Sequence, residues 1–120
     1  MEQNKALRLL GLATRAGLLV SGEDIVIDAM RKKKAKIVFL GNDCSENTLD
    51  KFKKKCFHYK TELNTMFSST EISHSIGKTR IVIAIIDDGF SKAIKKNLGG
   101  VENESKRDNW NSWSWTRKIN

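Results

Sequence analysis

The sequence lacks the features of membrane-spanning and secreted proteins. No apolar run in its 120 residues approaches the ~20 residues that a membrane-spanning helix needs. The N-terminal segment Met1–Lys5 also lacks the apolar stretch of a signal peptide. We therefore expect a cytoplasmic protein with no membrane partner. Proline is absent altogether, for which we have no physical account.

Cysteine and histidine are equally scarce. Cys44 and Cys56 lack the paired spacing of a zinc site, and Cys56 completes an apolar helical stripe, which favours a core position. His58 and His74 have no nucleophile or acid at a spacing that indicates catalysis. The pair Asp87–Asp88 precedes a helical pattern, where aspartates are common caps. We expect a protein that is not an enzyme and has no cofactor or metal.

Acidic residues are outnumbered by basic ones, 14 to 22, so the net charge is +8. Residues 99–120 contribute only +1 of this, and residues 1–98 therefore carry +7. A strongly basic folded part favours a polyanionic partner, most commonly nucleic acid; a generically basic protein is the alternative. We expect residues 1–98 to form one domain. Residues 99–120 are polar and hold all three tryptophans, and we expect them to form a flexible tail.

The first 98 residues alternate helix and strand patterns, which is typical of a layered α/β domain. Apolar periodicity predicts one helix over residues 2–16 and a second that buries Ile25, Val26, Ala29 and Met30. Ser21 and Asp24 have capping-box spacing before the second helix, as Ser68 and Glu71 have before the fourth. Asp43 or Ser45 would cap the third helix, and Asp87–Gly89 the fifth. Strands are predicted at residues 18–20, 37–40, 59–63 and 80–86, the third of them weak and near a sheet edge.

Three loops and one basic run could bind anions. The Gly-led helix start at Ser21–Asp24 presents unpaired backbone N–H groups. The run Arg31–Lys36 is either a phosphate-binding surface or a solvated helix end. If the strands 18–20 and 37–40 are parallel neighbours, Ser21–Asp24 and Asn42–Cys44 share one sheet edge. The turn Gly77–Arg80 reaches that edge only if the strand after it runs antiparallel to them.

An ordered set of segments gives this chain a family resemblance. These segments are residues 10–17, 21–24, 34–38, 43–48, 55–56, 75–78 and 87–90, which together cover residues 5–98. With them the chain resembles the kink-turn-binding ribosomal proteins of the L7Ae type, in particular their small bacterial YlxQ-like branch. The resemblance implies a three-layer α/β/α sandwich with a mixed four-stranded sheet. It also implies binding to a sharply bent RNA motif with tandem sheared G·A pairs, in ribosomal or other structured RNA.

The resemblance further implies which residues contact RNA. In the family, the start of the second helix contacts guanine edges, and the other two loops clamp bulged nucleotides. Carried over, these are Gly22, Glu23, Asp24, Ile25, Asn42, Asp43, Cys44, Gly77, Lys78, Thr79 and Arg80. This sequence has Asp24, Ile25 and Asp28 where the family's pattern has Asn, Glu and Lys. We expect phosphates to be neutralised by Lys32, Lys33, Lys36, Lys78 and Arg80.

Three functions remain open on these observations, the third being an accessory domain that resembles those attached to RNA-modifying enzymes. The first is non-enzymatic binding of a kink-turn by a monomeric protein of the translation apparatus. The second is a protein-interaction module on the same fold that has lost specific RNA binding, with a ribosomal or other protein as partner.

Overall fold

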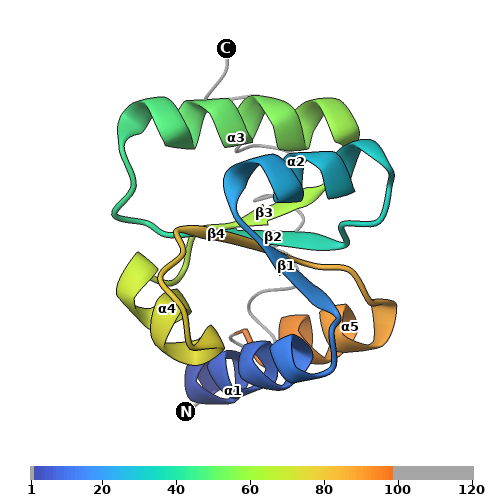
Figure 1. Cartoon of the computed structure of the whole chain (residues 1–120), viewed down its shortest axis with the longest axis vertical. Coiled ribbons are helices and arrows are strands. Elements are labelled where there is room, and N and C mark those ends of the chain that lie inside the picture. Colours follow the sequence, from blue (N-terminus) through green and yellow to red (C-terminus); the bar gives the residue numbers. More distant parts are fainter. Residues whose placement is uncertain (1, 99–120) are drawn as a thin grey trace.

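The computed structural model describes residues 2–98, drawn in colour in Figure 1. The elements are α1 (Glu2–Arg15), β1 (Leu19–Ser21), α2 (Glu23–Arg31), β2 (Ile37–Leu40), α3 (Glu46–Tyr59), β3 (Glu62–Asn64), α4 (Ser69–Ile76), β4 (Val82–Ile85) and α5 (Asp88–Lys96). The predicted alternation of helix and strand is therefore confirmed. The predicted tail, residues 99–120, lies outside the described residues. None of the described helices has the length and apolar character of a membrane span.

The four strands form one mixed sheet in the order β1-β4-β2-β3. β4 is antiparallel to both of its neighbours, and β2 and β3 are parallel. Figure 1 shows α2 and α3 on one face of the sheet and α1, α4 and α5 on the other. The predicted three-layer sandwich is confirmed, and so is the edge position of the weak third strand.

The two central strands form the middle of the core. Ile37 and Phe39 of β2 pack with the helices α1, α4 and α5, whereas Val38 and Leu40 pack with α2 and α3. All four side chains are fully buried, since successive residues of a strand point to opposite faces and each face is covered. Burial on both faces explains why these strands are continuous apolar runs in the sequence.

Local hydrogen bonds set most helix starts. Ser45 caps α3, and Ser68 and Glu71 form the predicted capping box of α4. The predicted box between Ser21 and Asp24 is wrong. Because Ser21 is the last residue of β1, Gly22 is the N-cap of α2, and no side chain caps this helix. The Ser21 hydroxyl accepts a hydrogen bond from Arg80 Nε at 3.1 Å.

Two predicted details of the elements are also corrected. Ile25 is 56% exposed, because the buried face of α2 is centred on Val26, Ala29 and Met30 and the preceding position lies about 100° away around the helix. The residues predicted as a strand from 59 onward begin within α3, which continues to Tyr59, so β3 starts only at Glu62.

Candidate nucleic-acid interface

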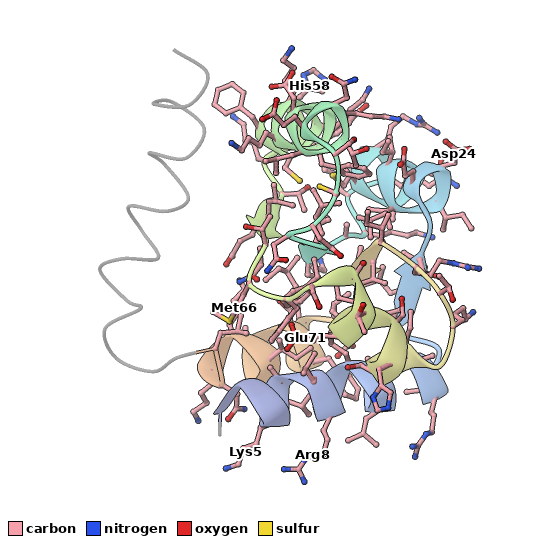
Figure 2. The ribbon with its side chains drawn as sticks, turned by 90° about the vertical axis from the view of Figure 1, so that its left-hand side faces the viewer. Lys5, Arg8, Asp24, His58, Met66 and Glu71 are labelled. Carbon is pink, nitrogen blue, oxygen red and sulfur yellow. The ribbon has the colours of Figure 1, made fainter. Side chains whose placement is uncertain are left out.

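One edge of the sheet brings together the three predicted loops. β1 and β2 run in the same direction, but the condition that they be neighbours is not met, because β4 lies between them. Since β4 is antiparallel to both, its start lies beside their ends. The Gly22 amide donates to Val82 O at 3.0 Å, and the Gly41 amide donates to Ile81 O at 2.8 Å. We call this the three-loop edge; it faces the viewer in Figure 2.

The start of α2 exposes its backbone at this edge. Gly22 has φ 99° and ψ 146°, a conformation that residues with a Cβ rarely adopt. A Cβ built there would meet no atom within 4 Å, so the space above the residue is open. The first turn of α2 also carries backbone N–H groups without partners inside the helix. A ligand can therefore approach the main chain closely at this point.

The two acids of the first turn differ in their partners. Lys51 of α3 donates to Glu23 Oε1 at 3.0 Å, so the Glu23 charge is neutralised. Asp24 is exposed and lies at the outer surface of α2 in Figure 2. In the described part of the chain it forms no ion pair. Its carboxylate is available to accept hydrogen bonds from a ligand. Sequence analysis missed Lys51, since its only signal is a place on the polar face of a helix.

The turn Gly77–Arg80 is held by serine hydroxyls. Ser73 Oγ accepts from the Arg80 amide and donates to Arg80 O, both at 2.9 Å. The Arg80 guanidinium donates to Ser21 Oγ at 3.1 Å and to Thr79 O at 2.7 Å. These bonds hold an exposed cation beside the start of α2. The exposed Lys78 and a groove of about 740 Å³ lie next to it.

The loop Asn42–Cys44 uses its polar groups inside the protein. Asp43 accepts from the Ser69 amide at 2.9 Å and from the Ser69 hydroxyl at 2.8 Å. These bonds, the amide first, lower the pKa of the Asp43 carboxyl. The Asn42 side chain donates to Met66 O at 3.3 Å. Cys44 is half-buried, and burial raises the pKa of its thiol. The loop is thus fastened to the segment before α4 and supports the edge.

The predicted phosphate-binding lysines of the basic run lie elsewhere. The Lys36 amide donates to Ile85 O at 2.7 Å, at the end of β4 and the start of β2. Lys32 and Lys33 directly follow α2 at the same end of the sheet. Figure 1 shows the α2–β2 connection on the right and the β2–α3 connection on the left. At roughly 3.3 Å per residue, the four residues of β2 separate the two edges by about 13 Å.

Asp28 is neutralised within its own helix. Lys32 Nζ lies 3.0 Å from Asp28 Oδ2, and Arg31 forms a second ion pair with the same carboxylate. The hydrogen bond from Lys32 is the main cause of the lowered pKa of Asp28. The acid that stands where the family's pattern has a lysine therefore repels a phosphate less than its formal charge suggests.

Comparison with known proteins places the chain in a family. Residues 4–95 match the ribosomal protein L7Ae/L30e/S12e/Gadd45 family. The chain belongs to this family. It is 47% identical to the RNA-binding protein YlxQ of Enterococcus faecium, over 82% of this chain and 96% of that protein. It is 45% identical to the RNA-binding protein YlxQ of Bacillus subtilis, over 72% and 87%. The predicted resemblance to the YlxQ-like branch of this family is confirmed.

Two solved structures share the fold of this chain. A protein of unknown function from Bacillus halodurans C superposes with a TM-score of 0.74 at 34% identity, covering 78% of this chain and 95% of that one. The Giardia lamblia 15.5kD RNA binding protein superposes with a TM-score of 0.68 at 16% identity, covering 85% and 89%. At that identity the second likeness concerns the fold alone.

Proposed function

We propose that this protein binds structured RNA without catalysing a reaction, and that its target is a kink-turn. One observation carries the proposal: the antiparallel β4 brings the α2 start and the loops Asn42–Cys44 and Gly77–Arg80 to a single sheet edge. The two YlxQ relatives, which are named RNA-binding proteins, support RNA as the partner.

The α2 start contacts guanine bases in this proposal. Gly22 lets the backbone approach the groove of the RNA closely. Carboxylates accept but cannot donate hydrogen bonds, so Asp24, and Glu23 when it leaves Lys51, accept from guanine N–H groups. Ile25 packs its exposed side chain against a base. The acids that interrupt the basic surface at this point thereby provide base recognition rather than phosphate binding.

Phosphates are bound by the cations that surround those acids. Lys78 and Arg80 follow α4, and Lys51 reaches the edge from α3. Asn42, Asp43, Cys44 and Thr79 shape the loops against which bulged nucleotides lie. Lys32, Lys33 and Lys36 have no part in this contact, since they lie at the other end of the sheet.

A gel-shift comparison tests the proposal. The RNAs are a kink-turn and the same duplex with its G·A pairs changed to Watson–Crick pairs, each at two salt concentrations. We expect much tighter binding to the kink-turn. With about three phosphates neutralised, log K should fall with log[salt] at a slope of about −2 to −3. Equal affinity for both RNAs would refute kink-turn recognition.

Three variants separate the proposed roles. Asp24→Ala should narrow the difference between the two RNAs, because it removes a base contact. Lys78→Gln should weaken both RNAs alike and reduce the salt slope by about 0.7 to 0.9, because it removes a phosphate contact. Lys92→Gln, at an exposed position of α5 outside the three loops, is the matched control and should change neither.

A protein-interaction role is the second candidate. It is favoured by the exposed Ile25, a large apolar side chain in the first turn of α2. The absence of any RNA affinity in the gel-shift comparison, together with a protein partner whose binding is lost in Ile25→Asp, would support this candidate over the first.

A further inference from the structure

A second basic groove lies at the sheet edge opposite the three loops. It has a volume of about 670 Å³, and its lining includes Lys36, Phe57, His58, Lys60, Glu62 and Lys95. These residues come from the start of β2, the end of α3, the start of β3 and the end of α5. In Figure 1 the C-terminal end of α3 and the α2–β2 connection lie together on the right. We call this surface the α3-end groove.

Two lysines at this edge adopt a conformation that favours glycine. Within residues 2–98, Lys33 (φ 64°) and Lys60 (φ 57°) are the non-glycine residues with positive φ. Glycine or asparagine adopts this conformation at lower cost. The two are close in space, because Lys33 Nζ donates to the carbonyl of Tyr59 at 3.2 Å. Each follows the end of a helix, where a left-handed residue is a common cap, so the two helix ends bring two positive charges to this edge.

The charges of the groove are positive and only partly paired. Lys95 Nζ lies 2.9 Å from Glu62 Oε1, and Lys36 Nζ lies 3.8 Å from Asp88 Oδ1. Lys60 is exposed and has no ion pair among the residues that the structure describes. The groove therefore has an excess of cations that suits an anionic ligand.

An exposed aromatic ring identifies the class of anion. Phe57 is 53% exposed at the end of α3, although phenylalanine is usually buried. Aromatic rings beside cations bind single-stranded nucleic acid, since a base stacks on the ring while the cations hold the backbone. In a duplex the bases are already stacked on each other. A single strand therefore fits this groove better than a helix does.

We propose that the α3-end groove binds a single-stranded segment of the RNA, with a base stacked on Phe57 and phosphates held by Lys36 and Lys60. The three-loop edge binds the structured part of the same RNA. The choice of RNA rests on the function proposed above. The site itself is separate, because none of its residues belongs to the three loops.

The test compares a blunt kink-turn RNA with the same RNA carrying about ten unpaired uridines at either end, a length within the usual site sizes. Binding is measured by fluorescence anisotropy with the full chain. We expect at least one of the two extensions to tighten binding about fivefold or more. With two more phosphates held, it should also steepen the salt slope by about 1.4.

Two substitutions should remove this gain and leave the blunt RNA unaffected. Phe57→Ala removes the stacking surface, and Lys60→Gly removes the charge while suiting the backbone at that position. Phe57→Leu and Lys60→Asn repeat the test with the apolar volume and the left-handed conformation retained, and they should also lose the gain. Lys92→Gln, outside the groove, should keep it. Circular dichroism shows whether each variant is folded.

Equal affinity for blunt and extended RNA would overturn the proposal, and so would a gain that survives in both Phe57→Ala and Lys60→Gly. If an acidic peptide or residues 99–120 occupied the groove instead, the full chain would bind the blunt and the extended RNA with equal affinity. Failure of the blunt RNA to bind counts only against the kink-turn function. In that case a free ten-uridine RNA, compared between the unaltered protein and the same two variants, decides whether the groove binds single strands.

Discussion

Gly22→Ala tests the backbone conformation at the centre of the proposed RNA interface, because the added Cβ causes no steric clash. The Cβ would meet no atom within 4 Å, so the whole cost in folding free energy comes from holding alanine at φ 99° and ψ 146°. Holding a residue with a Cβ in this region costs about 1–3 kcal/mol. Alanine loses less entropy on folding than glycine, which offsets about 0.4–1 kcal/mol. We therefore expect a net destabilisation of about 1–2 kcal/mol.

Urea unfolding measures this cost as a lower midpoint with an unchanged m value. Gly77 provides the matched control, since it has φ 80° and ψ 16°, which is left-handed helical geometry, and a Cβ there also meets no atom within 4 Å. Asparagine tolerates that geometry, so Gly77→Asn should cost only a few tenths of a kcal/mol. Gly22→Asn should cost as much as Gly22→Ala. Equal midpoints for Gly22→Asn and Gly77→Asn would refute the reasoning.

Two further predictions concern titratable groups. The pKa of Asp43 is lowered by its bonds to Ser69, so its stabilisation is present above the ordinary carboxyl pKa and is lost as the pH falls through the folded value. Asp43→Asn should therefore lower the urea midpoint at pH 7 and lower it less at pH 3; an equal effect at both would contradict this. Burial raises the pKa of Cys56 to about 12. A thiol reagent at pH 8 should thus modify Cys44, which is half-buried, and leave Cys56 intact until the protein unfolds.

The basic run Arg31–Lys36 shows where inference from sequence ends. Its composition correctly indicates a cationic surface, because lysines flanked by polar residues remain exposed. The nine helical residues of α2 carry the chain about 13 Å away from the Gly-led helix start, and the sequence did not predict which other elements the run meets there. The structure instead places Lys36 in the lining of the α3-end groove and the Lys33 ammonium group 3.2 Å from Tyr59 O, at the end of α3. Their closeness in sequence to Gly22 was therefore misleading.

Ile25 and Lys51 illustrate the same limit at the three-loop edge. Ile25 belongs to an apolar run, and periodicity alone did not decide which of two adjacent positions lies at the centre of the buried face. Lys51 is one of several similar lysines on α3, and only the packing of α3 beside α2 brings its ammonium group to Glu23. Lys51 therefore joins the candidate site through a contact between two helices, and Ile25 is exposed there because of its angular position on α2.

The sequence by itself determined the elements of this protein, because apolar periodicity, caps and glycine positions act over a few neighbouring residues. The buried strand at residues 37–40 and the capping box at Ser68–Glu71 are examples. Only the tertiary structure decided that β4 lies between β1 and β2. That order pairs Leu19 with Ile85 and Ile37 with Ile85, across long stretches of chain. Such pairings depend on burying both faces of the sheet under the helices at once. They determine which loops share the three-loop edge and which lysines lie at the opposite end of the strands.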